Sequence, residues 1–430
     1  MELDDWIAKQ ARLSADLMER AISAVHLRRD RAQFGQSIVP ARGSVLASPV
    51  IANWDPEPDY FFHWLRDSAI VMRTVVELAV HARDAAGRLR WTRHFEDFVA
   101  FSLRLARLEG RDLDSFADRT DPGFRQFLCP DAEIRALAGD RLLGEPRFNP
   151  DGTIDVLRWS RPQYDGPALR ALACLKYLAA GFGRSADLEA LLRLDLDFTA
   201  RYAGETCIGP WEEADENAHH YYVAAVQLGA LVHGRGFLGA PAEAAEARLR
   251  ADLGRHWSEG QEVYAAIWPF TGKARDDLVD SAIFLAVLDA DLAEGPHSVA
   301  DPRVWRTLAA LEDVFAREFP INRGRAAPAL GRSRRDRYFG GGAWYVTTLA
   351  AATLNYRRAT RDGDARYLAR GDAFMATVRD LTPPDRHLSE QVDRASGVPA
   401  SARDLTWSYA AFVAAAHDRD EAVLRGAARP

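Results

Sequence analysis

Apolar residues recur at spacings of three and four along most of this 430-residue chain, whereas strand-like alternation is scarce. That spacing is the period of one face of an α-helix. The gaps between helix-like windows alternate: some are short, such as 181–183 and 362–363, and the others are long and rich in Gly, Pro, Trp and Arg. The predicted helices, about twelve in number, lie near residues 2–24, 67–83, 92–109, 165–181, 184–202, 216–234, 240–257, 277–291, 303–318, 342–360, 363–380 and 403–418.

This alternation of gaps predicts helical hairpins, because short turns join antiparallel neighbours at one end and the long loops gather at the other. Every second helix is apolar all round, as in 168–178 and 343–354, which suits an inner ring covered by an outer one. The sequence therefore predicts an all-α fold, an (α/α)6 barrel of twelve helices in two concentric rings, with a site in the long loops of one face. The stretch 110–158 is only patchily periodic and is interpreted as a wall of that site, with one short helix near 130–138.

Charge and cysteine content limit the classes of partner. A formal net charge of -7 disfavours nucleic acid and anionic membrane surfaces. No stretch approaches the length of a transmembrane span. The three cysteines share no ligand-like spacing, so we expect no disulfide framework, no metal and no cofactor. The N-terminal residues lack the pattern of a signal peptide, which predicts a cytoplasmic protein; a periplasmic or secreted location stays open if a signal peptide has been removed.

A short polar island, Gly209-Pro210-Trp211-Glu212-Glu213, separates two helix-like windows. Adjacent carboxylates also occur simply in the first turn of a helix, where the helix dipole favours them. Five other long loops, however, carry the same combination of carboxylate, arginine and indole, and Glu390 stands out among them. We hypothesise that Glu212 and Glu390 are the acid and base of a sugar-cleaving site.

Aromatic residues alternate at Tyr60, Phe62 and Trp64, ahead of the pair Arg66-Asp67. The pair has an alternative reading as a helix cap. Rings that stack on a sugar face, next to charged groups that bind hydroxyls, are what a pyranose requires. In a later loop Trp159 is the better ligand candidate, whereas Arg161 and Asp165 are interpreted as braces of the loop.

Several motifs in this chain resemble the glucoamylases of glycoside hydrolase family 15. The strongest are Trp-Ser-Arg-Pro-Gln-Tyr-Asp-Gly-Pro-Ala-Leu-Arg at 159–170, Trp-Glu-Glu at 211–213, Leu-Ser-Glu-Gln at 388–391 and Ser-Ala-Arg-Asp-Leu-Thr-Trp-Ser-Tyr-Ala-Ala at 401–411. The resemblance implies an (α/α)6 domain that inverts anomeric configuration and removes single glucose units from the non-reducing ends of α-glucans. It implies that Glu212 is the general acid and Glu390 the general base. The implied substrate-binding residues are Arg66, Asp67 and Arg332 for the terminal glucose, Glu213 for the next sugar, and the aromatic residues Tyr60, Trp64, Trp159, Trp211, Tyr338, Trp344 and Trp407.

The chain departs from the family pattern on the leaving-group side of the expected pocket. Asp155 and Phe62 stand where the family has tyrosines, Gly209 where it has an aspartate, and 340–343 where it has Asn-Gly-Asn-Pro. The stretch from Glu213 to Gln227 is slightly longer than in fungal members and contains a His-His-Tyr-Tyr run. We expect a single catalytic domain over 1–430, without a starch-binding module or an N-terminal β-sandwich. A monomer acting on soluble α-glucans or malto-oligosaccharides is expected.

An inverting glycosidase requires two carboxyl groups roughly 6.5–9.5 Å apart, so that a water molecule fits between the base and the anomeric carbon. Glu212 should hold its proton, because Glu213 supplies a like charge and Trp211 an apolar wall. Glu390 should stay ionised, with help from a backbone donor or a tyrosine hydroxyl. The alternatives left open are hydrolysis of trehalose, exo-cleavage of α-1,6-glucans as in a glucodextranase-type member of the family, and a non-catalytic glucan-sensing module.

Overall fold

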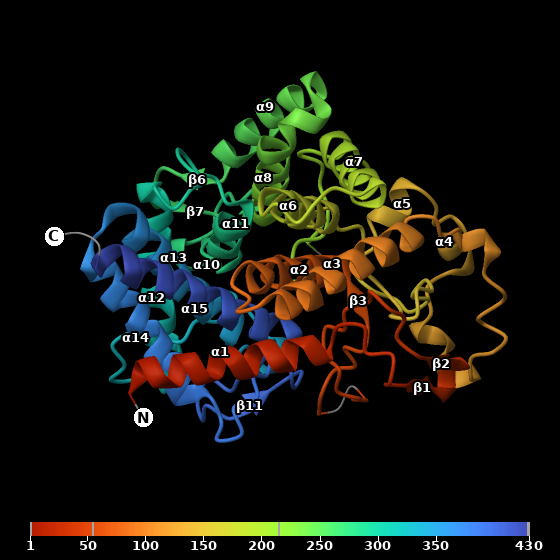
Figure 1. Ribbon diagram of the computed structural model, residues 1–430, viewed down its shortest axis with the longest axis horizontal. Coiled ribbons are helices and arrows are strands. Elements are labelled where there is room, and N and C mark those ends of the chain that lie inside the picture. Colours follow the sequence, from red (N-terminus) through yellow and green to blue (C-terminus); the bar gives the residue numbers. More distant parts are fainter. Residues whose placement is uncertain (1, 54–55, 214–215, 428–430) are drawn as a thin grey trace.

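The long helices of the computed structural model match the predicted windows (Figure 1). The structure describes residues 2–53, 56–213 and 216–427; residues 54–55, and residues 214–215 within the long 213–227 stretch, lie outside the described part. Within the described part the long helices are α1 Leu3–Arg20, α2 Leu65–Val80, α3 Ala85–Leu105, α6 Asp165–Ala179, α7 Ala186–Arg201, α8 Tyr221–Leu238, α9 Ala240–Arg255, α11 Ala282–Ala290, α12 Pro302–Glu318, α13 Tyr345–Asp362, α14 Ala365–Leu381 and α15 Thr406–Ala427.

These helices form two rings. In the inner ring α2, α6, α8, α11, α13 and α15 each contact the next, and α15 closes the ring on α2. In the outer ring α1, α3, α7, α9, α12 and α14 cover α15, α2, α6, α8, α11 and α13 in turn. The inner helices α8 and α13 are buried along most of their length, whereas α12 buries one face only. The predicted (α/α)6 barrel is confirmed.

Three predicted helix starts were wrong, and short strands explain one of them. The window at 92–109 begins earlier, at Ala85, where the Asp84 side chain caps the helix by accepting a hydrogen bond from Gly87 N. The window at 216–234 begins as helix only at Tyr221, because His219 and His220 form β5 and pair with β8. The window at 277–291 is divided into α10 (Arg275–Leu278) and α11. Between them Asp280 forms a β-bridge with Ser333, and its carboxylate accepts a hydrogen bond from Ala282 N. The chain is therefore not helical at Asp280.

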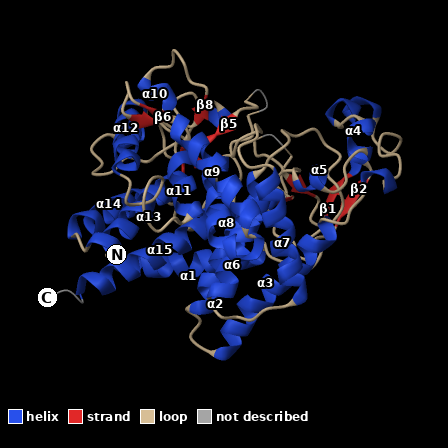
Figure 2. Ribbon diagram, turned by 90° about the horizontal axis from the view of Figure 1, so that it is seen from above, coloured by secondary structure: helices blue, strands red, loops and turns tan. Residues whose placement is uncertain are grey.

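The strands are short and tie loops to one another on one side of the helices (Figure 2). β3 pairs with β4, β5 with β8, β6 with β7, β1 with β2, and β10 lies between β9 and β11. The pairs β3–β4, β5–β8 and β9–β10 join segments far apart in sequence, so these strands fix how the loops meet. Their bounds are β1 Arg29–Arg31, β2 Gln36–Ile38, β3 His63–Trp64, β4 Arg147–Phe148, β5 His219–His220, β6 Trp257–Ser258, β7 Val263–Tyr264, β8 Ile267–Trp268, β9 Ala343–Trp344, β10 Gln391–Val392 and β11 Pro399–Ala400.

The stretch 110–158 forms a lobe at the edge of the barrel, beside β1 and β2 (Figures 1 and 2). It contains α4 (Asp131–Arg135), which confirms the predicted short helix, and α5 (Asp140–Leu143). A small hydrophobic core of its own joins this lobe to Phe62 and Trp64. No helix in the described part of the chain is long and apolar enough to cross a membrane.

Candidate functional site

A cavity of about 450 Å³ opens where the long loops enter the N-terminal ends of the inner helices. Its wall comes from the loops that precede α2, α6, α8, α13 and α15. Every residue predicted for the site lines it: Tyr60, Trp64, Arg66, Asp67, Trp159, Trp211, Glu212, Glu213, Arg332, Tyr338, Trp344, Glu390 and Trp407. The remaining lining residues are Ala47, Arg158, Ser160, Pro210 and Leu405.

A tight turn places Glu212 at the wall of the cavity. Its backbone has φ of 63°, in the left-handed region that non-glycine residues rarely adopt. Two hydrogen bonds hold the turn: Glu212 N donates to Gly209 O at 3.1 Å, and Ser160 Oγ donates to Glu212 O at 2.6 Å. At Gly209 a Cβ atom would lie 2.4 Å from the ring of His220. Glycine, where the family pattern has an aspartate, therefore leaves room for the His220 ring.

Four donors converge on the Glu212 carboxyl group. Oε1 accepts hydrogen bonds from Trp64 Nε1 at 2.9 Å, Arg66 Nη2 at 3.0 Å and Gln163 Nε2 at 3.0 Å. Oε2 accepts one from Trp159 Nε1 at 2.5 Å. Trp64 and Arg66 come from the junction of β3 with α2, and Trp159 and Gln163 from the loop before α6. The orientation of the carboxyl group therefore depends on contacts among three separate segments.

The negative charge of the neighbouring Glu213 is partly balanced by Arg332. Arg332 Nη2 donates to Glu213 Oε1 at 3.1 Å, and Arg332 Nε donates to Asp336 Oδ2 at 2.9 Å. The like-charge effect expected of Glu213 is therefore reduced by Arg332. Trp211 provides the expected aromatic wall, and its Nε1 donates to Asp280 Oδ1 at 2.8 Å.

Strand pairing explains the surroundings of Glu390. The register Gln391↔Ala400 between β10 and β11 puts Glu390 opposite Ser401, whose hydroxyl donates to Glu390 Oε2. Burial raises the pKa of Glu390 to about 7, and the hydrogen bond from Ser401, the charge of Arg332 and a hydrogen bond from Tyr60 act in the opposite direction. The predicted tyrosine hydroxyl is present, but burial outweighs it. Glu390 is therefore about half ionised near pH 7, whereas we expected it to stay ionised.

Arg66 and Asp67 lie in the first turn of α2, and they differ in how many hydrogen bonds they make to other protein groups. Arg66 Nη1 donates to Gln163 Oε1 at 2.9 Å and to Asp165 Oδ2 at 3.0 Å, so much of this guanidinium serves protein groups. Asp67 lies 3.6 Å from Arg66 Nε, too far for a hydrogen bond, and its buried Oδ2 has no hydrogen-bond partner among the described residues. Burial raises the pKa of Asp67 to about 6, against the charge of Arg66. Asp67 thus offers the cavity an acceptor that a ligand hydroxyl would satisfy.

Sequence reasoning missed some of the polar groups around the carboxyl groups. Gln163 and Ser401 belong to the motifs already quoted, and their place within those motifs was the available signal. The loop braces were predicted: Asp165 pairs with Arg66, and Arg161 pairs with Glu145 at 3.1 Å, both outside the cavity wall. Within the residues that the structure describes, no group of His, Cys, Asp and Glu is arranged to hold a metal ion.

Comparison with known proteins shows the family and the fold to which this chain is similar. The family model described as glycosyl hydrolases family 15 matches residues 31–124, 133–369 and 366–417. A probable glucoamylase of Schizosaccharomyces pombe is 28% identical over 97% of this chain and 92% of its own length, and glucoamylase-1 of Schizophyllum commune is 28% identical over 89% and 70%. The glucoamylase structure from Hormoconis resinae covers 97% of this chain and 74% of that chain, with a TM-score of 0.78 and 25% identity. The structure from Saccharomycopsis fibuligera, at 22% identity and a TM-score of 0.77, covers 98% and 96% and supports the fold.

Proposed function

Because the chain belongs to the glycosyl hydrolases of family 15, we propose that it is an inverting, exo-acting glucohydrolase. It releases β-D-glucose from the non-reducing ends of soluble α-1,4-linked gluco-oligosaccharides. The observation that carries the proposal is that Glu212 and Glu390, nearly two hundred positions apart in sequence, line one cavity with aromatic walls. The glucoamylase names of the relatives support the choice of substrate.

In this proposal Glu212 gives its proton to the glycosidic oxygen while the bond to the anomeric carbon breaks. Glu390 takes a proton from a water molecule, and the oxygen of that water attacks the anomeric carbon from the opposite face. The product is therefore the β-anomer. The charge and hydrogen bonds around the two carboxyl groups differ: Glu212 faces four donors, whereas Glu390 is buried beside Ser401. Such a difference is typical of an acid and base with separate tasks.

Asp67 and Arg332 are proposed to bind the outer hydroxyls of the terminal glucose. A residue in the middle of a glucan has a neighbouring sugar bonded to one of those hydroxyls, so only a chain end would satisfy them. Rings of Tyr60, Trp64 and Trp407 on the cavity wall would pack against the C–H faces of the sugar.

The function is tested by glucose release from maltose, maltotetraose, isomaltose and trehalose measured side by side, with the anomer of the first product read by ¹H NMR. We expect β-glucose from the two α-1,4-linked substrates at the highest kcat/KM. Initial release of α-glucose would contradict inversion. A higher kcat/KM for trehalose or isomaltose would assign the other linkage, and binding of maltose without any glucose release would indicate a sensing module.

Asp67→Ala should lower kcat/KM about 10- to 100-fold on every active substrate, since a hydrogen bond to a charged group is lost and all of the substrates present the same terminal glucose. The measurement is steady-state kinetics across the panel, with Asp114→Ala, an exposed surface carboxylate in a side chain that is 90% exposed, as the matched control. Unchanged kcat/KM across the panel would remove Asp67 from the glucose-binding group.

The pH profile should respond to Ser401. Because the pKa of Glu390 is raised by burial to about 7, the proposed base is protonated below that pH, and kcat/KM should rise with pH along an acidic limb. Ser401→Gly removes the hydroxyl and accepts the local φ of 62° without strain. The ionised carboxylate loses a donor, so the acidic limb should move to higher pH. Ser389→Ala, which removes a hydroxyl bonded to Gln391 O, should leave the limb in place; equal shifts in both variants would argue against Glu390 as its source.

A further inference from the structure

The guanidinium group of Arg147 is completely enclosed by the protein and sits against the aromatic wall of the cavity. We propose that Arg147, held by Asp155, is a positioning residue for the acid: it fixes the Trp159 indole and strengthens its N–H as the donor to Glu212 Oε2. This inference rests on the proposed function, because it assigns a second layer to the same site.

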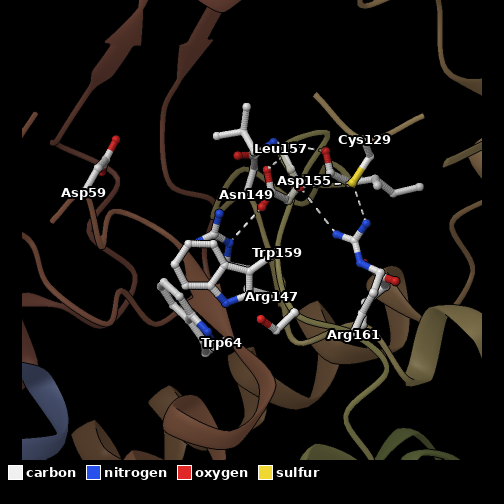
Figure 3. Close-up of polar contacts among 12 residues, drawn as sticks. Asp59, Trp64, Cys129, Arg147, Asn149, Asp155, Leu157, Trp159 and Arg161 are labelled. Atoms are coloured by element: carbon white, nitrogen blue, oxygen red, sulfur yellow. Dashed lines mark hydrogen bonds and ion pairs between the residues drawn. The ribbon is translucent and has the colours of Figure 1, made fainter. Parts of the chain in front are cut away.

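The fold brings Arg147 to this place through the pairing of β3 with β4. The register Trp64↔Arg147 sets the two residues directly across from each other. A bridge between Phe148 and Ile154 turns the chain back, so that Asp155 comes beside Arg147. Arg147 Nε donates to Asp155 Oδ2 at 2.7 Å, and Asp155 Oδ1 accepts from Leu157 N at 3.0 Å (Figure 3). The aspartate that departs from the family pattern is therefore the anchor of this arginine.

Aromatic faces surround the rest of the guanidinium group. Its central carbon lies 3.6 Å from the ring centroid of Trp159, 4.0 Å from that of Phe62 and 4.9 Å from that of Trp64. Figure 3 shows Arg147 next to the Trp159 indole. A second cation, Arg31, has its central carbon 3.9 Å from the ring centroid of Phe62, so this ring contacts two guanidinium groups.

This arrangement is poorly explained as a simple structural ion pair. The Arg147 and Asp155 side chains are each only 1% exposed, and both terminal nitrogens of Arg147 have no hydrogen-bond partner within the described part of the chain. A buried ion pair with unsatisfied donors is a weak source of stability. Its favourable contacts are instead with the ring faces, and a desolvated cation attracts such faces strongly. The consequence is a Trp159 ring held in one plane.

The plane of Trp159 matters because the two oxygens of Glu212 are used unequally. Oε1 accepts from three donors, which occupies its lone pairs, whereas among the described residues Oε2 accepts from Trp159 Nε1 alone. An acid proton on this carboxyl group therefore belongs on Oε2. When that proton moves to the glycosidic oxygen, negative charge develops on Oε2, and the Trp159 N–H stabilises it. The positive charge of Arg147 over the indole polarises that N–H and makes it a better donor.

The test compares Arg147→Met, Arg147→Lys and Asp155→Asn with the unaltered protein on two substrates. Maltotetraose needs protonation of its leaving group, whereas α-D-glucopyranosyl fluoride loses fluoride without an acid. We expect Arg147→Met to lower kcat on maltotetraose about tenfold, which corresponds to about 1.4 kcal/mol, with KM changed less than about twofold. The alkaline limb of kcat/KM should move to higher pH, because the ionised carboxylate has a weaker donor. On the fluoride the change should stay within about twofold. Arg147→Lys should give smaller shifts in the same direction, and Asp155→Asn, which releases the arginine but keeps its charge, should lower kcat on maltotetraose by a smaller factor.

Trp159→Phe provides the decisive background, because it keeps a ring and removes the N–H. There Arg147→Met should cost less than about threefold, since residues that act through one another are not additive. Arg31→Met, which removes the other cation that contacts Phe62, is the matched control and should leave the alkaline limb in place. Equal losses on both substrates, or an undiminished effect in the Trp159→Phe background, would overturn the proposal and leave Arg147 as a structural residue. Failure of the proposed function is distinguishable, because the unaltered protein would then release no β-glucose.

Discussion

Glu212→Gln should lower kcat on maltotetraose about 10²- to 10⁴-fold, the contribution usual for a positioned general acid, while maltose still binds with an affinity within about threefold. The amide keeps the shape of the carboxyl group and can accept from Trp64, Arg66 and Gln163 as Oε1 does now. It has no acidic proton for the glycosidic oxygen. The measurements are single-turnover rates on maltotetraose and calorimetric titration with maltose.

Leaving-group chemistry supplies the control for this prediction. On α-D-glucopyranosyl fluoride, which needs no acid, Glu212→Gln should lose less than about tenfold, because the base is intact. Glu213→Gln changes the adjacent carboxyl group, which Arg332 engages, and should act mainly on KM. A Glu212→Gln variant that keeps near-normal turnover of maltotetraose would place the acid elsewhere.

Glu390→Ala should lower kcat about 10²- to 10⁴-fold on maltotetraose and on the fluoride alike. Both reactions require a water molecule to lose its proton as it attacks, so an improved leaving group does not compensate. Steady-state kinetics on the two substrates measure this directly. The pattern differs from that of Glu212→Gln, and the pair of substrates therefore separates the two proposed roles.

Rescue by azide gives a second measurement of the base. Azide is a small anionic nucleophile that needs no deprotonation and fits the space left by the truncated side chain. With Glu390→Ala and α-D-glucopyranosyl fluoride, added azide should restore turnover and form β-D-glucopyranosyl azide, with inversion at the anomeric carbon. Azide should not rescue Glu212→Ala on maltotetraose. An α-configured azide product would contradict attack from the face opposite to the leaving group.

The helices were predictable because their signal is local. The 3.6-residue period and the alternating gaps predict the order of helices and the ring to which each belongs, and α2 to α15 follow it. The starts of α8 and α11 were wrong, since β5 and the bridged Asp280 are set by partners elsewhere in the chain. A two-residue strand has too few residues to show a period of its own.

The sequence predicted which residues form the site, but it predicted only some of the hydrogen bonds among them. The family resemblance implied every predicted residue that now lines the cavity, including Glu212, Glu390 and Asp67. It did not indicate that Arg66 would contact Glu212, or that Ser401 would donate to Glu390. These contacts follow from loop pairing such as Gln391↔Ala400, which no local pattern specifies.

The sequence by itself determined the barrel, the face that carries the site and the two carboxyl groups proposed for catalysis, because helical periodicity and motif order are written along the chain. Only the tertiary structure decided how those groups are tuned. Burial raises the pKa of Glu390 to about 7, Arg332 offsets the charge of Glu213, and Arg147 lies against Trp159 behind Glu212. Desolvation and electrostatic interactions depend on the distances between residues brought together from separate loops, and those distances exist only once the rings have closed.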